Sequence, residues 1–357
     1  MAIITNTIIY DGMELVYNGE NSLIYSEDPY NPLDLPPYTI RLLFTTHITP
    51  HFDRGTATQI SQNPNVWDFT YENSNWDNIF PHLYDERSYL LEVRGANTTN
   101  VTSMNNLFGY CKSLSAVSAF DTSNVTGMEH MFDDCQTLSS VPLFDTSNVT
   151  DMHNMFDGCW QLRSVPLFDT SNVTDMVSMF SACHRLSSVP LFDTHNVREM
   201  YRMFNSCWAL KTVPLFDTSN VTGMKRMFEE CSSLSSVPLF DTSEVTNMEN
   251  MFYRCYALSS APLFDTHNVM EFSDMFYQCS SLSAVPLYDT TNAYNMNNMF
   301  RSAVNVKTGA LALYQQASTQ ANPPTYHVGT FRDCGINTTQ GAAELAQIPT
   351  SWGGTMT

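Results

Sequence analysis

The sequence has little positive charge. Its 357 residues contain 16 lysines and arginines against 36 aspartates and glutamates, which gives a formal net charge of −20. Polyanions are bound by clustered lysine and arginine side chains, so nucleic acid is not an expected partner. Long apolar runs are missing too, and without a stretch of about 18 apolar residues no membrane-spanning segment is predicted.

Export and catalytic signals are also missing. Residues 1–7 show no basic segment followed by an apolar core, as a signal peptide would, and no anchor motif closes the C-terminus. We therefore expect a protein that stays in the cytoplasm or leaves by virion assembly and lysis. The sequence shows neither a Ser/His/Asp arrangement nor a glycine-rich phosphate-binding phrase. A catalytic site needs one unique constellation, so we predict neither an enzyme nor a cofactor.

What the sequence does contain is an internal repeat of constant length. The phrase Phe-Asp-Thr recurs at one fixed interval from Phe120 through Phe144 to Phe264, and Tyr288 begins an eighth copy. A cysteine column runs with the same period from Cys111 to Cys279. A fixed period of this size is typical of solenoids, in which each unit buries its apolar face against its neighbours.

One unit, residues 138–161, divides into two halves. Leu138, Val141 and Leu143 give the pattern Leu-x-x-Leu-x-Leu, the strand-and-turn half of a leucine-rich repeat. Val149, Met152, Met155 and Phe156 then follow at the spacing of one helix face. Asn148 is predicted to cap that helix, with Asp151 as its capping partner.

The predicted fold is therefore an α/β repeat solenoid, a leucine-rich-repeat-like stack of strand-turn-helix units. We expect four regions: an N-terminal β-hairpin attachment segment with a proline-rich linker (1–37), a β-rich cap domain (38–89), the solenoid (90–308) and a C-terminal cap (309–357). In the first two regions, Asn-Gly and Asp-Gly phrases predict hairpins, residues 38–44 a strand, and Trp67 and Trp76 core positions. Residues 309–319 are predicted to be helical, and 342–348 to form a last helix or strand.

A proline column, from Pro142 to Pro286, lies inside the predicted strand. Proline cannot donate to a β-ladder. We therefore expect very short strands, and we expect the methionine and phenylalanine contacts of the other half to carry most of the inter-repeat stability.

The 24-residue phrase that begins at Phe144, Phe-Asp-Thr-Ser-Asn-Val-Thr-Asp-Met-His-Asn-Met-Phe-Asp-Gly-Cys-Trp-Gln-Leu-Arg-Ser-Val-Pro-Leu, resembles the BspA-like (bacterial surface antigen) type of leucine-rich repeat. The likeness covers about residues 90–303. It implies a non-catalytic surface protein, often an adhesin, of gut and mucosal bacteria, some protists and phages of gut bacteria. Residues 55–59 and 65–68 resemble the flanks of gut-phage repeat proteins.

Two polar columns have alternative interpretations. The cysteines, one per layer, are expected to be buried free thiols, because parallel side chains align poorly for disulfides or for zinc. The aspartates from Asp121 to Asp289 either accept hydrogen bonds from turn amides or form a Ca²⁺-binding ladder. The first alternative is preferred, and no metal ligand is predicted.

The column after each cysteine varies freely and is expected to face solvent. It contains Trp160, His184, Trp208 and Tyr256, and exposed aromatic residues in a row are typical of binding surfaces. With Tyr201 and Arg202 from the same layers, these residues form the predicted ligand-binding set, because Trp, Tyr and Arg dominate hot spots. The face carrying the nearly uniform Ser140 and Pro142 columns offers less shape for recognition.

The preferred function is a virion-associated adhesion protein of a gut phage that binds a host-cell protein or glycan. Residues 1–37 would attach it to virion or tail proteins, and a homo-oligomer such as a trimer is compatible with a fibre. A BspA-like adhesin of the bacterial cell surface and a purely structural spacer are the alternatives.

Overall fold

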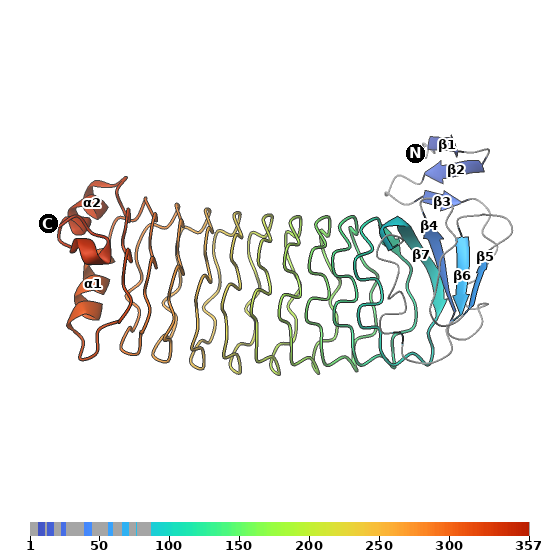
Figure 1. Ribbon diagram of the computed structural model, residues 1–357, viewed down its shortest axis with the longest axis horizontal. Coiled ribbons are helices and arrows are strands. Elements are labelled where there is room, and N and C mark those ends of the chain that lie inside the picture. The colour runs from blue at the N-terminus through green and yellow to red at the C-terminus, as the bar shows by residue number, and fades with distance from the viewer. Residues whose placement is uncertain are drawn as a thin grey trace.

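The computed structural model describes residues 6–10, 13–17, 23–25, 39–44, 56–59, 66–70, 76 and 87–356. From residue 90 onward the chain forms flat coils, one for each repeat, that stack into an elongated rod (Figure 1). A β-sheet lies at the N-terminal end of the rod, and two helices close the other end. The chain is therefore a leucine-rich-repeat-like solenoid with the period that the sequence predicts.

The N-terminal strands form two sheets. Strands β1 (Asn6–Tyr10), β2 (Met13–Tyr17) and β3 (Leu23–Tyr25) pair antiparallel in chain order, and Tyr10 pairs with Met13, as the hairpin prediction requires. The second sheet has the order β5-β6-β4-β7-β8. Its strands are β4 (Thr39–Phe44), β5 (Thr56–Gln59), β6 (Val66–Thr70), β7 (Leu90–Asn97) and β8 (Ala116–Val117).

Strand β7 joins this second sheet to the rod. It pairs antiparallel with β4 and parallel with β8 of the first repeat, so the boundary predicted at residue 89 divides a continuous sheet. A short 3-10 turn, η2 (Arg87–Tyr89), leads into it. Trp76 is fully buried and its amide donates to Ser103 O at 2.9 Å, which confirms its core position. The side chain of Trp67 lies outside the described residues.

Each coil has a turn segment whose alternate amides point to the next coil. In one layer the four donors lie 2.9–3.1 Å from carbonyls of the layer that follows. The pairs are Met152 to Asp175, Asn154 to Val177, Phe156 to Met179 and Gly158 to Ser181. The intervening amides of Met155, Asp157 and Cys159 close tight turns within the layer, because each donates to the carbonyl three positions earlier, as Met155 does to Met152. The backbone on this side is thus satisfied partly by its own layer and partly by its neighbour.

The predicted helix in this segment is wrong. Asn154 has φ +53° and Gly158 φ +71°, left-handed values that a right-handed helix excludes. Overlapping turns place every third or fourth residue inward, as a helix does. The apolar spacing therefore does not distinguish a run of turns from a helix. The capping prediction is wrong with it. The Asn148 side chain donates to Ser123 O of the preceding layer at 2.8 Å, and Asp151 Oδ1 accepts from the amide of His153 at 2.9 Å.

The proline side of the coil has few inter-layer hydrogen bonds. In most layers one amide of the column that contains Arg163 reaches the neighbouring layer, as Arg163 N does to Ser139 O at 3.2 Å. In the first repeat Ser118 takes the proline place, and its amide donates to Val93 O at 2.9 Å beside the short strand β8. The missing proline therefore coincides with strand formation, and the predicted shortness of the strands is confirmed.

The last leucine of the predicted strand motif faces solvent. Leu167 is 61% exposed, whereas Phe168 beside it is 2% exposed. The Phe168 amide donates to Pro166 O, two positions back, at 3.1 Å. This γ-turn interrupts the alternation of inward and outward side chains along the backbone. Phenylalanine therefore takes the inward place that the motif assigned to leucine.

The interior of the rod consists of stacked columns. Phe204 is fully buried and lies 5.7 Å, centroid to centroid, from both Phe180 and Phe228. Valine, methionine, cysteine and leucine columns fill the remainder. A buried threonine column ties the layers together, since Thr146 Oγ1 donates to Asp169 O at 2.7 Å and the same bond recurs along the stack.

The C-terminal cap replaces the missing next layer. Helix α1 (Ala310–Thr319) confirms the prediction for residues 309–319. Its Gln316 side chain donates to Tyr288 O at 2.6 Å, and Gln320 at its end donates to Thr290 O at 2.8 Å. Residues 326–334 form a last turn segment that contains buried Phe331 and Cys334. Helix α2 (Thr339–Leu345) and η3 (Thr350–Trp352) follow. Neither α1 nor α2 is long and apolar enough to cross a membrane, and the rest of the described chain offers no other such helix.

Truncating the phenylalanine column should be costly. Phe204→Ala is expected to lower the free energy of unfolding by about 3–5 kcal/mol, because it opens a cavity between two stacked rings. Trp160→Ala, an aromatic truncation at a 41% exposed position, should cost about 1 kcal/mol or less. Urea titrations of both variants measure the difference, and equal losses would show that the Phe204 column is not core.

The left-handed turn positions give a second test. Gly158→Ala is expected to destabilise the fold by about 1–2 kcal/mol, since the added Cβ would lie 3.1 Å from Asp134 Cα. Ala182 occupies the same column with φ +55°, so Ala182→Gly should stabilise by up to about 1 kcal/mol. Changes of the same sign in urea titrations would refute the left-handed geometry.

Candidate binding surface

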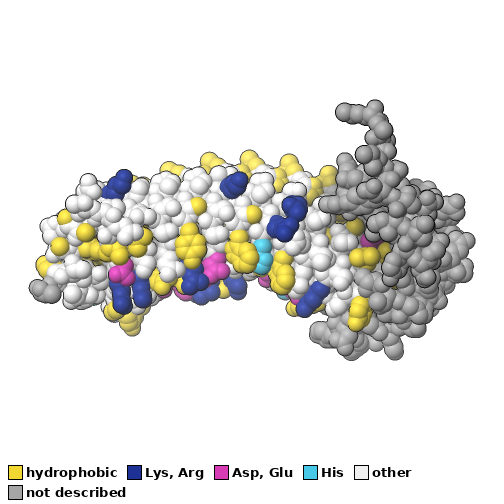
Figure 2. All heavy atoms as spheres, turned by 90° about the horizontal axis from the view of Figure 1, so that it is seen from above, with side chains coloured by type: hydrophobic (Ala, Val, Ile, Leu, Met, Phe, Trp, Pro, Cys, Tyr) yellow, Lys and Arg dark blue, Asp and Glu magenta, His cyan; other side chains and the backbone are white. Residues whose placement is uncertain are grey.

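The residue after each column cysteine leaves the core and turns outward. Its amide donates to the carbonyl two positions back, as Trp160 N does to Gly158 O at 2.9 Å, and this tight turn projects the side chain from the rod. Trp160, Trp208 and Tyr256 are 41%, 48% and 43% exposed. The column therefore faces solvent, as its variability predicts. Figure 2 shows hydrophobic, histidine and charged side chains interspersed along this part of the surface.

Three of the predicted residues form one aromatic stack. The His184 ring lies 5.8 Å from Trp160, at 23°, and 3.7 Å from Trp208, at 5°. Burial between the two indoles lowers the pKa of His184, so the imidazole is neutral at neutral pH. The stack thus presents uncharged flat rings over three successive layers.

A hollow opens where the stack ends. Ser232 takes the next place in the column, and its small side chain leaves a space of about 240 Å³ between Trp208 and Tyr256. Arg254 and Glu230 also line the space and form an ion pair of 2.9 Å. Aromatic walls with a paired cation and carboxylate suit a ligand that has both apolar faces and hydroxyl groups.

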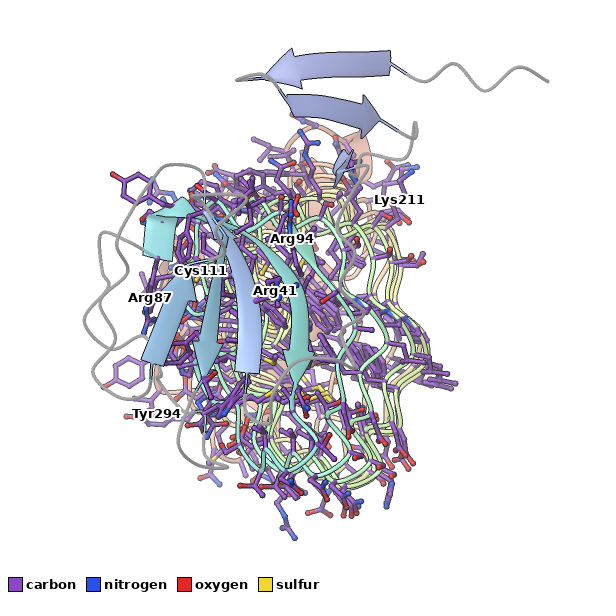
Figure 3. The ribbon with its side chains drawn as sticks, turned by 90° about the vertical axis from the view of Figure 1, so that its right-hand side faces the viewer. Arg41, Arg87, Arg94, Cys111, Lys211 and Tyr294 are labelled. Atoms are coloured by element: carbon purple, nitrogen blue, oxygen red, sulfur yellow. The ribbon has the colours of Figure 1, made fainter. Side chains whose placement is uncertain are left out.

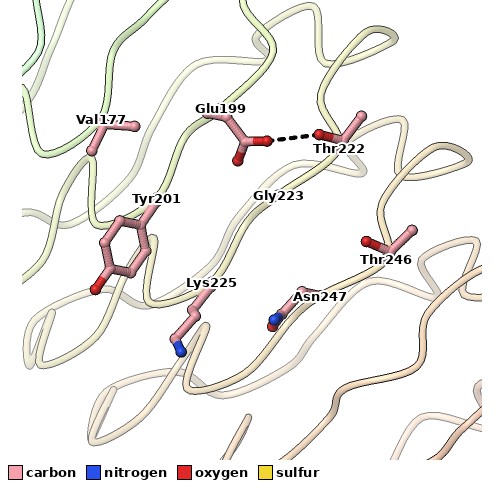
Figure 4. Close-up of a pocket in the computed structure, with 8 residues that line it drawn as sticks. All are labelled: Val177, Glu199, Tyr201, Thr222, Gly223, Lys225, Thr246 and Asn247. Carbon is pink, nitrogen blue, oxygen red and sulfur yellow. Dashed lines mark hydrogen bonds between the residues drawn. The ribbon is translucent and has the colours of Figure 1, made fainter.

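Tyr201 belongs to a different hollow. It lines a space of about 420 Å³ over neighbouring layers (Figure 4), together with Val177, Glu199, Thr222, Gly223, Lys225, Thr246 and Asn247. Gly223 keeps this space open, and Glu199 extends across it to accept a hydrogen bond from Thr222 Oγ1 at 2.8 Å. A Cβ at Gly223 would come within 2.3 Å of Glu199 Oε2. Any other residue at position 223 would therefore displace that carboxylate.

Arg202 lines neither hollow. Its guanidinium carbon lies 6.0 Å from the centre of the Tyr201 ring, and its buried Nε has no hydrogen-bond partner among the described residues. The structure thus brings Trp160, His184 and Trp208 together and places Tyr256 across a hollow from them. Tyr201 and Arg202 lie apart from that group. The sequence-based set missed Ser232, Glu230 and Arg254, although a serine between two aromatic residues of one column was a visible signal.

The cysteine column is part of the core. Cys159 Sγ donates to Phe132 O of the preceding layer at 3.1 Å, and this bond repeats from Cys135 to Cys279. All nine cysteines are buried, as predicted for the column, and Figure 3 shows Cys111 inside the outline of the stack, with Lys211 and Tyr294 at its periphery. Burial raises the pKa of the Cys111 thiol to about 12, despite nearby Arg87. Such thiols are poor nucleophiles and poor metal ligands.

The aspartate column holds turns, as the preferred alternative predicts. Asp145 Oδ1 accepts from the amide and the hydroxyl of Ser147 at 3.1 and 2.7 Å, and these bonds hold the pKa of Asp145 below its usual value. One other group, Glu129, Asp151 and His153, has donor atoms within 4.8 Å of one another and could hold a small cation. It is the only such cluster within the described residues, and no sequence-based prediction named it.

A family model matches three overlapping stretches of the chain, residues 74–164, 139–236 and 208–313. It is described as "Mycoplasma protein of unknown function, DUF285". The chain belongs to this family. The DUF285 match spans the repeats in which the BspA-like phrase occurs, while no curated protein is significantly similar to the chain.

Solved structures resemble this DUF285 chain only loosely. A leucine-rich repeat protein of T. pallidum is 19% identical, with a TM-score of 0.33 over 53% of this chain and 74% of that protein. A plant peptide hormone receptor, RGFR1 in complex with RGF2, is 12% identical, with a TM-score of 0.30 over 61% and 35%. A leucine-rich repeat protein of Eubacterium ventriosum is 15% identical, with a TM-score of 0.26 over 61% and 85%.

Thiol reactivity tests the position of the cysteines. Because the thiols are buried and their pKa values raised, a maleimide should label the native protein slowly and label all nine sites on unfolding. A Ser236→Cys variant adds an exposed thiol as a control and should react within the mixing time. Rapid labelling of the wild type would place the column outside the core.

Proposed function

We propose that the chain is a non-catalytic binding protein that recognises a host-cell glycan or protein along the column after cysteine. The observation that carries this proposal is the Trp160–His184–Trp208 stack with the hollow before Tyr256. The core needs none of these side chains, since Lys112 and Gln136 fill the same place in other layers. Exposed aromatic rings beside an ion pair suit the apolar faces and hydroxyl groups of a sugar.

The repeated architecture supports binding over catalysis. Each layer offers nearly the same backbone, and the threonine, aspartate and cysteine columns are engaged in inter-layer or turn hydrogen bonds. Functional variety is then confined to exposed columns. A stack of repeats with variable outer positions is well suited to an extended binding surface.

We further propose that the protein is a virion-associated adhesin of a gut phage, attached through residues 1–37. The resemblance of residues 55–59 and 65–68 to gut-phage repeat proteins supports this. The BspA-like resemblance of the repeats equally supports an adhesin of the bacterial cell surface. Mass spectrometry of purified phage particles and of surface-shaved host cells separates the two, because the protein should be recovered from only one of them.

The binding test uses a Trp160→Ala/Trp208→Ala double variant on a bacterial glycan array and on intact gut bacteria. Loss of two stacked hot-spot residues should weaken binding at least ten-fold. Lys112→Ala/Ser280→Ala is the matched control, because it changes the same column outside the stack, and it should bind as the wild type does.

A different outcome would move the binding site to another face of the rod. Unchanged binding by the folded tryptophan variant, with loss on enlarging Ser164 and Ser188 to tyrosine, would place the site on the serine-proline face. Circular dichroism and the urea midpoint verify that every variant is folded. Absence of binding by the wild type and by every folded variant would favour the structural spacer.

A further inference from the structure

The solvent-facing leucines form one unbroken row along the rod. They occupy the same column in successive layers, and each is 52–65% exposed. The members of this leucine row are Leu143, Leu167, Leu191, Leu215, Leu239, Leu263 and Leu287. A continuous apolar strip of this kind is unusual on a monomeric protein and typical of an interaction surface.

The fold does not require leucine in this row. From Pro166 to Pro286 a γ-turn at each proline points the leucine side chain outward, and the aromatic residue that follows fills the interior. In the first repeat Ala119 takes the same place and is also exposed. The column after cysteine varies from layer to layer, as Lys112, Gln136 and Trp160 do, whereas this row is leucine in seven layers. A contact outside the single chain would account for that uniformity.

The two flanks of the row differ in charge. Two positions after each leucine comes the exposed aspartate column, one carboxylate per layer. Four positions before each leucine lies a column that is serine in most layers. In the remaining layers it is Arg163, Lys211 or Lys307, and all three side chains are exposed. The ion pairs found among the described residues use none of these three cations. Figure 2 shows Lys and Arg side chains set beside a row of hydrophobic side chains along one long edge of the rod.

We propose that a second copy of this chain covers the leucine row, with the two rods side by side and parallel. A twofold axis along the row places the aspartate column of each copy against the flank of its partner that contains Arg163, Lys211 and Lys307. The antiparallel arrangement would instead place the aspartate columns of the two copies against each other, which like-charge repulsion disfavours. Charge therefore selects the parallel pair.

Spacing and area favour a second copy over an unrelated partner. Two identical rods share one layer spacing, so each leucine of one row can meet its counterpart in the other along the whole length of the row. At about 100 Å² of removable apolar surface for each leucine, the row offers roughly 700 Å² per copy. The resulting total of about 1,400 Å² falls within the range of stable interfaces. The stack at Trp160, His184 and Trp208 belongs to another column and stays available to ligand.

The assembly test compares full-length variants by light scattering and by sedimentation equilibrium. The wild type should have at least twice the monomer mass, and Leu191→Ser/Leu215→Ser/Leu239→Ser should be a monomer with an unchanged circular dichroism spectrum. Trp160→Ala/Trp208→Ala should retain the assembly, which keeps this test independent of the proposed function. A monomeric wild type at tens of micromolar would overturn the proposal and leave the row for a different partner.

Cross-linking determines the direction of the rods. Leu215 is the midpoint of the row, so Leu215→Cys should form an intermolecular cross-link with a short bis-maleimide in either direction. Leu143→Cys lies at one end and should cross-link to itself only if the rods are parallel. No Leu143→Cys cross-link, together with cross-links between Leu143→Cys and Leu287→Cys chains in a mixture, would refute the parallel arrangement. The native cysteines are buried and do not compete.

Discussion

The hydrogen bonds between alternate amides of one turn segment and the carbonyls of the next hold the rod together. In each layer, alternate amides donate to carbonyls of the next layer, as Asn154 does to Val177 and Phe156 does to Met179. That geometry requires left-handed residues at fixed places, which are asparagine or glycine at Asn106, Asn154 and Gly158 and other residue types, such as Ala182 and Arg202, in other layers. The same bonds set the layer spacing, and the phenylalanine rings therefore stack at 5.3–5.7 Å in the central layers.

Inter-layer cohesion is unevenly distributed around the coil. The turn side contributes several backbone bonds per layer, and the Cys159 thiol and the Thr146 hydroxyl add side-chain bonds to carbonyls of adjacent layers. The proline side contributes one backbone bond and an inward valine. Placing most bonds on one side frees the other for side chains that face outward. This division explains how a regular core coexists with an exposed leucine row and an exposed aromatic stack.

The period and the buried columns could be predicted from sequence because they depend only on which residue types recur at a fixed interval. The repeat interval, the burial of cysteine and the turn role of Asp145 follow from such patterns. The turn segment could not be predicted, because a helix and a run of turns place Val149, Met152 and Met155 on the same side. The leucine that follows each proline, such as Leu167, was misassigned because inward and outward side chains alternate only along extended backbone, and the γ-turn at Pro166 ends that alternation. Of the candidate site, exposure of the aromatic column was predictable, whereas the hollow depends on which neighbours Ser232 has in space.

The similarity of the layers has a consequence for how such a surface can change. Adjacent repeats make nearly the same contacts, so whole repeats could be gained, lost or exchanged while β7 and α1 continue to close the two ends. The hollow between Trp208 and Tyr256 exists only because a serine repeat stands between two aromatic ones. Reordering repeats would fill or reopen such spaces without a new fold. Under the proposed function, ligand preference would depend on the order of the repeats, and recombination within the gene could revise it one layer at a time.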